Sequence, residues 1–114
     1  MRMCVGIIGT GWVGASVAIS TLQTGAASEL LLHDARREIA EGEAMDLAQG
    51  APFYPPAAVR VATIEEMRAC GAIVVTAGRG GRAGESRLDL LRDNAAIIRT
   101  IGATLVGFDG IIIV

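Results

Sequence analysis

The residues with the clearest chemical use are those at positions 9–14, Gly-Thr-Gly-Trp-Val-Gly, which fit the pattern G-x-G-x-x-G. Gly9 permits a tight turn, Gly11 leaves space for a pyrophosphate against the backbone, and Gly14 lets a helix pack closely on a strand. The N–H groups and the dipole of a helix that begins at this turn would face the anion. An apolar run precedes the pattern and small residues follow it, so we predict a dinucleotide site rather than a glycine-rich turn without a ligand.

A candidate partner for this turn is Asp34, which lies twenty residues beyond Gly14 and directly after a second apolar run. A carboxylate at this place can accept hydrogen bonds from both hydroxyls of an adenosine ribose, and it repels a 2′-phosphate. Arg36 and Arg37 could instead receive such a phosphate, but we interpret them as solvated charges at the start of a helix. The pattern therefore favours NAD over NADP.

A second candidate segment covers residues 78–87, which combine four glycines with three arginines. Because glycine lowers the cost of large backbone changes, this segment could close over a ligand. Closure would carry Arg79, Arg82 or Arg87 toward an anionic substrate. The alternative is a flexible, solvated loop that has no substrate.

The remaining candidates for chemistry are one histidine and two cysteines. His33 lies beside Asp34, on the adenosine side of the predicted site, so we predict a structural role for it rather than general-base catalysis. Cys4 and Cys70 lie in or beside apolar runs, and we expect free, buried thiols and a cytoplasmic protein. These three residues are too few and too separated to predict a nucleophilic triad or a metal site.

The composition of the chain describes one folded domain, with 114 residues of which 52% are hydrophobic and 19% are charged. Ten basic and twelve acidic residues give a net charge of -2, so we expect no basic surface for a nucleic acid. Residues 3–28 carry no charge, but five glycines and several hydroxyl residues interrupt them. This segment therefore predicts a strand, a turn and a buried helix rather than a membrane span.

The elements that must position these residues follow from the apolar pattern, since short apolar runs alternate with stretches of helical spacing. We expect strands at residues 3–8, 29–33, 59–62, 72–76 and 110–114. We expect helices at residues 11–26, 38–49 and 87–106, and a brief helix that Thr63 and Glu66 cap. Loops at residues 51–58 and 77–85 connect them, and part of the run 111–114 should be exposed apolar surface.

The order of these strands follows from the right-handed crossover rule, which gives 3-2-1-4-5 in a doubly wound parallel α/β sheet. The switch point of that sheet lies between the first and the fourth strand. Ligands bind there, beyond the carboxyl ends of the strands. The segments that begin at Gly9 and Ala77 should therefore line the site.

Taken together, these motifs resemble the amino-terminal half of the lactate/malate dehydrogenase family. The resemblance covers essentially the whole chain and rests on blocks in family order and spacing, at residues 6–14, 31–34, 41–50, 75–78 and 84–90 and at Asn94. The most distinctive block is 84–90, Gly-Glu-Ser-Arg-Leu-Asp-Leu. The resemblance implies a Rossmann-type domain that binds NAD through Gly9, Thr10, Gly11, Trp12, Val13, Gly14, Asp34, the backbone of Ala77 and Gly78, and Asn94.

The resemblance also implies roles toward a substrate. Arg87 matches the lid arginine of the family, which polarises the substrate carbonyl during hydride transfer and stabilises the charge that develops there. The position that distinguishes substrates, commonly Gln for lactate and Arg for malate, falls on Gly81. Arg82 is adjacent, and a loop displaced by one residue would offer its guanidinium to the second carboxylate of malate. The substrate residues implied are thus Gly81, Arg82 and Arg87, and the choice between lactate and malate stays open.

The catalytic histidine of the family, its partner aspartate and the arginine that grips the substrate carboxylate belong to a second domain, and none has a position in this sequence. We interpret residues 1–114 as one NAD-binding domain of an NAD-dependent 2-hydroxy acid dehydrogenase, truncated before the sixth strand and inactive by itself. The resemblance implies a small 2-hydroxy or 2-keto acid as substrate, and a homodimer or homotetramer. The alternatives are a stand-alone NAD(H)-binding or sensing module without catalysis, and a Rossmann-like domain without a ligand.

Overall fold

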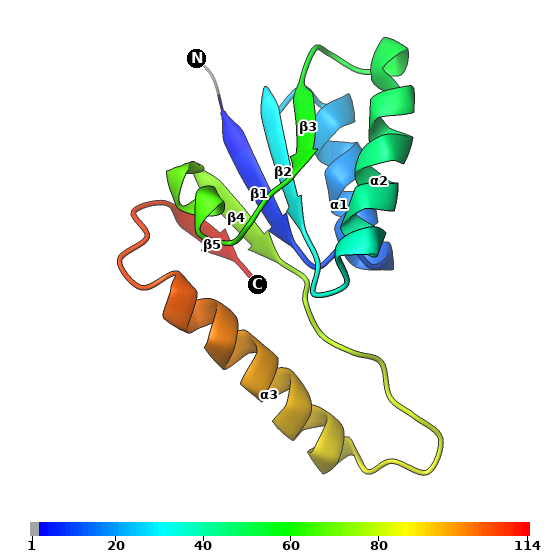
Figure 1. The fold of residues 1–114 in the computed structure, drawn as a ribbon, viewed down its shortest axis with the longest axis vertical. Coiled ribbons are helices and arrows are strands. Elements are labelled where there is room, and N and C mark those ends of the chain that lie inside the picture. The colour runs from blue at the N-terminus through cyan, green and yellow to red at the C-terminus, as the bar shows by residue number, and fades with distance from the viewer. Residues whose placement is uncertain (1–2) are drawn as a thin grey trace.

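Five short parallel strands form the centre of the molecule, in the order β3-β2-β1-β4-β5 (Figure 1). The structure is a computed structural model that describes residues 3–114. The strands are β1 (Cys4–Ile8), β2 (Glu29–His33), β3 (Ala58–Val61), β4 (Ala72–Val75) and β5 (Ile111–Ile113). Neighbouring strands pair in parallel, with Val5 of β1 opposite both Leu30 and Ala72. The predicted strand order and the doubly wound α/β class are confirmed.

The helices connect the strands by crossovers. They are α1 (Trp12–Gln23), α2 (Arg37–Gln49), α3 (Arg87–Thr104) and the short 3-10 helices η1 (Ala51–Phe53) and η2 (Glu66–Ala69). Helix α1 ends before the predicted residue 26 because Gly25 adopts a φ of 71°, outside the helical region. The Thr63 hydroxyl accepts from the N–H of Glu66 and the Glu66 carboxylate accepts from the N–H of Thr63, at 3.2 and 2.7 Å, which confirms the predicted cap.

The two faces of the sheet bury separate apolar clusters, because successive side chains of a strand point to opposite faces. Helices α1 and α2 cover one cluster, which contains Val5, Ile7, Ala18, Leu22, Leu30, Leu32 and Leu47. Helix η2 and the end of α3 cover the other, which contains Ile8, Leu31, Met67, Ile73, Ile101 and Leu105. Burial on both faces explains why the inner strands read as continuous apolar runs.

Helix α3 and strand β5 are the least covered elements. Ile101 is the buried residue of α3, and the amino-terminal half of this helix extends beyond the carboxyl ends of the strands (Figure 1). Strand β5 pairs with β4, yet its three isoleucines are exposed, so the expected apolar surface at residues 111–114 is confirmed. None of the helices within residues 3–114 is both long and apolar enough to cross a membrane.

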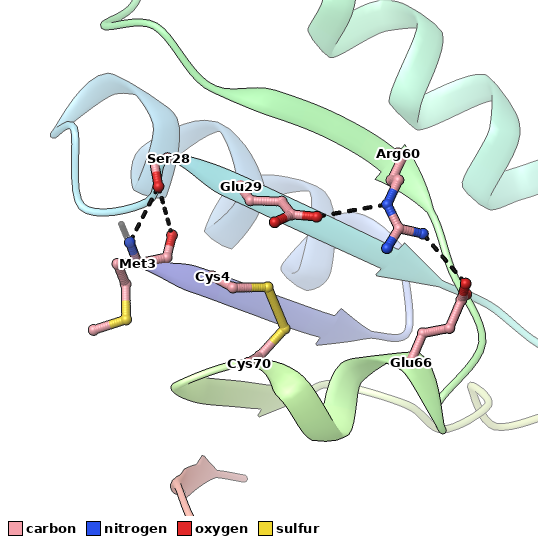
Figure 2. Close-up of a disulfide and its surroundings, with 7 residues drawn as sticks. All are labelled: Met3, Cys4, Ser28, Glu29, Arg60, Glu66 and Cys70. Atoms are coloured by element: carbon pink, nitrogen blue, oxygen red, sulfur yellow. Dashed lines mark hydrogen bonds and ion pairs between the residues drawn. A yellow bond between two sulfur atoms is a disulfide. The ribbon is translucent and has the colours of Figure 1, made fainter. Parts of the chain in front are cut away.

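The two cysteines form a disulfide, contrary to the expectation of two free thiols (Figure 2). Cys4 begins β1, and Cys70 lies between η2 and β4. The pairing of β1 with β4 brings their Cα atoms to 4.6 Å although 66 residues separate them in sequence. In the same place the N–H of Gly71 donates to the carbonyl of Cys4 at 3.0 Å. The expectation was wrong because separation along the chain does not measure distance across a parallel sheet.

Candidate functional site

The three glycines of residues 9–14, two before α1 and one in its first turn, have three different surroundings. Gly9 adopts a φ of 97°, and a Cβ on it would lie 2.7 Å from the backbone nitrogen of Ala77. A Cβ on Gly14 would lie 1.9 Å from the carbonyl oxygen of Gly9, so the first turn of α1 packs directly on the loop before it. A Cβ on Gly11 would meet nothing within 4 Å. The open space is therefore at Gly11, where the sequence predicts the pyrophosphate.

The beginning of α1 offers free backbone donors at this open space. Gly11 is the N-cap residue, no side chain accepts from the first turn, and that turn holds no acidic residue. The first N–H groups of a helix have no partner inside it, and together with the helix dipole they favour an anion. Trp12 and Val13 are exposed on the first turn, with 94% of Trp12 accessible, and the cavity described below does not include them.

The carboxylate of Asp34 lies beside the turn and is held there by the backbone. One of its oxygens accepts from the N–H and the hydroxyl of buried Thr10, at 2.8 and 3.1 Å, and the other accepts from the N–H of Arg36 at 3.0 Å. Burial alone would raise the pKa of Asp34, but these hydrogen bonds outweigh it and lower the pKa. Asp34 is thus an oriented, ionised acceptor, half-buried at the carboxyl end of β2.

A cavity of about 620 Å³ opens where β1, β2 and β4 end, at the switch point that the strand order predicts. Its volume is in the range of small-molecule and cofactor sites. Polar groups and backbone enter it from three loops, and a set of aliphatic side chains faces them. The predicted residues that line it are Gly9, Gly11, Asp34, Ala77 and Gly78.

Several lining residues were not predicted from the sequence. The aliphatic ones are Ile39, Ile64, Ile97 and Ile101, which come from four separate segments. Thr76 also lines the cavity, and its hydroxyl donates to the Gly9 carbonyl at 2.7 Å. The spacing of residues 97 and 101, one helical turn apart, is a signal that marks one face of α3, whereas nothing local marks the other positions.

The basic residues around Asp34 have structural partners. The Nδ1 atom of His33 lies 3.2 Å from the carbonyl oxygen of Ala62, the residue that follows β3, and His33 also lines the cavity. Arg36 and Arg37 are exposed and pair with Glu38 and Glu41 of their own helix, at 3.3 and 2.8 Å. These pairs are contacts that solvated helix charges make, and Arg36 also lines the cavity beside Asp34.

Of the residues predicted to face a substrate, Arg79 lines this cavity, whereas Gly81, Arg82 and Arg87 lie outside it. Arg87 begins α3 and borders a shallow hollow that Leu88, Leu90, Leu91 and Asn94 also line. A Cβ on Gly81 would lie 3.6 Å from Leu90, and Arg82 is exposed in the loop beside it. The predicted loop over residues 77–85 is confirmed. Ser86 caps α3, and its hydroxyl accepts from the N–H of Asp89 at 3.1 Å.

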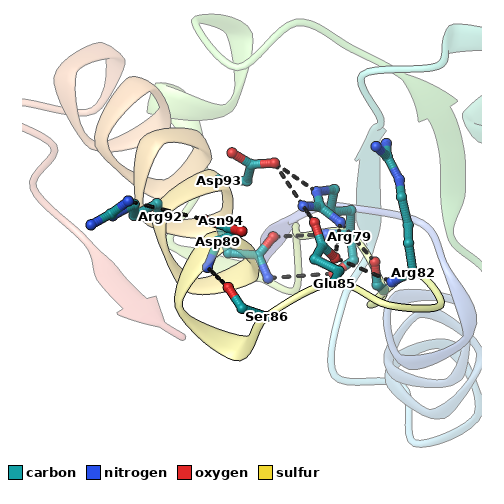
Figure 3. Close-up of polar contacts among 9 residues, drawn as sticks. Arg79, Arg82, Glu85, Ser86, Asp89, Arg92, Asp93 and Asn94 are labelled. Carbon is teal, nitrogen blue, oxygen red and sulfur yellow. Dashed lines mark hydrogen bonds and ion pairs between the residues drawn. The ribbon is translucent and has the colours of Figure 1, made fainter.

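Asn94 connects the two regions. Its side-chain oxygen accepts from the N–H of Arg79 at 2.9 Å, and its amide nitrogen donates to the Arg79 carbonyl at 3.3 Å (Figure 3). It also contacts Gly78, whose Cβ position lies 3.4 Å from the Asn94 oxygen. Asn94 therefore fixes the backbone that leaves β4, at the border of the cavity.

The family model of the lactate/malate dehydrogenase NAD-binding domain matches residues 3–114. The chain belongs to the lactate/malate dehydrogenase family. The L-lactate dehydrogenase of Priestia megaterium is 42% identical over 112 residues, which are 96% of this chain and 35% of that protein. The L-lactate dehydrogenase of Bacillus caldotenax is 41% identical over 113 residues, 96% of this chain and 36% of that protein. This chain thus spans about a third of the length of these relatives.

Solved structures of dehydrogenases share the fold. The ligand-bound minor L-lactate dehydrogenase of Enterococcus mundtii superposes with a TM-score of 0.91 at 40% identity, over 97% of this chain and 36% of that chain. The malate dehydrogenase of Picrophilus torridus gives 0.83 at 31% identity, over 96% of this chain and 36% of that chain. The predicted Rossmann-type class and the predicted family are confirmed, and NAD is the cofactor of this type of domain.

The described residues of this chain fit that cofactor. The open space at Gly11 accommodates a group that approaches the backbone closely, and the first turn of α1, whose N–H groups no side chain caps, begins beside it. The oriented carboxylate of Asp34 suits a pair of ribose hydroxyls rather than a phosphate. The aliphatic wall suits the flat apolar surface of an adenine ring.

Proposed function

We propose that residues 1–114 form the cofactor-binding domain of an NAD-dependent 2-hydroxy acid dehydrogenase. The observation that carries the proposal is that one cavity is bordered both by the glycine turn with its free helix terminus and by the fixed carboxylate of Asp34. The first group suits a pyrophosphate and the second a ribose. The reaction proposed for the whole enzyme is hydride transfer between NAD(H) and a 2-hydroxy or 2-keto acid.

In this proposal the chain binds and orients the cofactor. The turn at residues 9–14 holds the pyrophosphate through backbone N–H groups, with Trp12 and Val13 on its outer side. Asp34 accepts from the adenosine ribose, and the backbone of Ala77 and Gly78 follows the cofactor toward β4. Asn94 keeps that backbone in place. The chemistry that NAD supplies when bound is the gain or loss of a hydride.

The substrate end of the proposal rests on the loop and on the start of α3. We assign Arg87 to the substrate carbonyl, where a guanidinium stabilises charge that develops in the transition state. Gly81 offers no side chain to the substrate, so Arg82, the adjacent residue, is assigned to a substrate carboxylate. The relatives named above include both lactate and malate dehydrogenases, and the proposed substrate class is a small 2-hydroxy acid. We further propose a homodimeric or homotetrameric, cytoplasmic enzyme.

The experiment that tests this function is calorimetry of the chain with NADH, combined with turnover assays on pyruvate and oxaloacetate. We expect the chain to bind NADH and to show no turnover. Absence of NADH binding would contradict the cofactor assignment and favour a domain without a ligand. Turnover by this chain alone would contradict the assignment of catalysis to a second domain.

The role of Arg87 is tested in an enzyme that contains this domain together with its substrate domain. Arg87→Gln should lower kcat about a hundredfold or more, the range for loss of one transition-state donor, while NADH affinity changes little. An unchanged kcat would rule out the assignment of Arg87 to the substrate carbonyl.

A further inference from the structure

Arg79 is the centre of a network of ion pairs in the loop between β4 and α3 (Figure 3). Its guanidinium donates to both carboxylate oxygens of Glu85, one of them at 2.9 Å. It also donates twice to one oxygen of Asp93 on α3, from Nε at 3.0 Å and from an outer nitrogen at 2.7 Å. A further donation reaches the carbonyl of Gly80 at 3.1 Å. One side chain thus joins the beginning of the loop, its end and the helix that follows.

The backbone reinforces this arrangement at both ends of the loop. The main chain of Arg79 is held by the amide of Asn94, as described above. At the other end, the carboxylate of Glu85 accepts from the N–H of Arg82 at 3.1 Å, and the N–H of Glu85 donates to the Arg82 carbonyl at the same distance. The loop therefore closes into a ring of residues 79–85 that is fixed to α3 through Asp93 and Asn94.

The two residues that close the ring, Arg79 and Glu85, are less exposed than the residues between them. The side chains of Arg79 and Glu85 are 20% and 15% exposed, whereas residues 80–84 are all exposed. The hydrogen bonds from Arg79 lower the pKa of Glu85 to about 2, and those to Glu85 and Asp93 raise the pKa of Arg79. Both groups stay charged at neutral pH, so the ring is closed by full charges.

The three arginines of this segment consequently differ in what they can reach. Arg79 is committed to two carboxylates, and its guanidinium would have to leave both of them to bind a substrate. The side chain of Arg82 extends away from the network (Figure 3), and the structure gives it no side-chain partner within residues 3–114. Arg87 follows the ring closure by two residues, directly after the cap of α3.

We propose that Arg79 is a positioning residue: its pairing with Glu85 and Asp93 holds the 79–85 ring against α3 and so sets where Arg82 and Arg87 stand relative to a substrate. The proposal rests on the function proposed above for the substrate end of the domain. Arg79 also lines the cavity, but its guanidinium is engaged by Glu85 and Asp93, and the proposal assigns it no contact with substrate or cofactor. An arginine is needed because its planar fork engages two carboxylates at once, which the single ammonium of a lysine does not reproduce.

The test compares Arg79→Gln and Arg79→Lys with Arg92→Gln as the matched control, since Arg92 is an exposed arginine of α3 that lies 3.9 Å from Asp89. Hydrogen exchange is followed at the amides of Arg79, Arg82 and Glu85, which donate to Asn94, to the Glu85 carboxylate and to the Arg82 carbonyl respectively. Compared with the unmodified chain, we expect these amides to exchange about tenfold faster or more in Arg79→Gln and to show an intermediate increase in Arg79→Lys. The exchange rate in Arg92→Gln should equal that of the unmodified chain. Unchanged exchange in Arg79→Gln would overturn the proposal.

Two further measurements keep the outcome interpretable. Glu85→Gln breaks the same ring from its other end. The double variant Arg79→Gln/Glu85→Gln should therefore exchange no faster than the faster single variant, and additive effects would contradict a shared network.

The second measurement is kinetic. In an enzyme with its substrate domain, Arg79→Gln should raise KM for the keto acid about tenfold and leave NADH affinity unchanged. An unchanged KM together with faster loop exchange would overturn the positioning role of Arg79. If the unmodified chain does not bind NADH, the result overturns the proposed function and not the ring itself.

Discussion

The cofactor corner, residues 9–14 with Asp34, and the loop corner, residues 79–94, are positioned by different forces. In the cofactor corner the backbone of one segment lies against the backbone of another, so closely that a single Cβ on Gly14 would lie 1.9 Å from an oxygen. In the loop corner, charged side chains bridge gaps that the backbone leaves open. The first is fixed by steric exclusion and the second by electrostatic attraction near the surface.

This difference shows how one small domain can combine a rigid site with an adjustable one. A pyrophosphate site works best when its donors are already in place. A loop that admits and releases a substrate has to change conformation, and contacts between charged side chains near the surface can break and reform in water. The two corners meet at Gly78 and Asn94, where the cavity border and the ring share one stretch of backbone.

The largest effect on stability is expected from adding one methyl group to the cofactor corner. Gly14→Ala places a Cβ 1.9 Å from the Gly9 carbonyl, so we expect the free energy of unfolding to fall by about 3 kcal/mol or more and NADH binding to be lost. Gly42→Ala is the control, because its Cβ meets nothing within 4 Å on helix α2. It should stabilise the chain by about 0.5–1 kcal/mol. Urea unfolding measures both, and equal effects would show that packing does not govern this corner.

A smaller effect is expected from removing charge at the cofactor corner without adding bulk. Asp34→Ser should weaken NADH binding about tenfold to a hundredfold, the loss of a charged hydrogen-bond acceptor, and should reduce discrimination against NADPH. Calorimetry with both cofactors measures this change. Asp109→Ser, at an exposed aspartate, is the matched control. Equal affinities of the Asp34→Ser variant and the unmodified chain would refute the ribose assignment.

The smallest expected effect is on the pH dependence of the free energy of unfolding. Because the pKa of Glu85 is about 2 in the folded chain and about 4.3 in an unfolded one, its ion pair stabilises the fold fully above about pH 4.3, and this contribution is lost as the pH falls toward 2. The lowered pKa of Asp34 acts in the same direction. Glu85→Gln should therefore flatten the acid limb of the unfolding curve slightly, whereas exposed Glu65→Gln should leave it unchanged. An identical acid limb in Glu85→Gln would contradict the charged ring.

The cofactor corner was predictable because its determinants are local. The glycine pattern specifies its own turn, and the position of Asp34 follows from the length of one crossover and the end of one strand. The loop corner was predictable only in outline. The segment of glycines and arginines was recognised, but the partner of Arg79 depends on the path by which residues 80–84 return to α3, and no local pattern encodes that path.

Two other features could not be predicted from the sequence, because they also depend on how distant segments come together. The disulfide between Cys4 and Cys70 depends on the register of β1 against β4, which single-strand patterns do not specify. The aliphatic wall of the cavity gathers Ile39, Ile64 and Ile97 from segments that alternate with unrelated elements. Apolar residues of this kind read as core in a sequence, and only the assembled sheet shows which of them face a cavity.

The exposed indole of Trp12 gives this domain a built-in optical reporter. It is the single tryptophan of the chain and stands on the first turn of α1, beside the open space at Gly11. Reduced nicotinamide absorbs in the wavelength range in which an indole emits, so occupancy of the turn should quench its fluorescence by energy transfer. Binding at the cofactor corner can therefore be followed without a label.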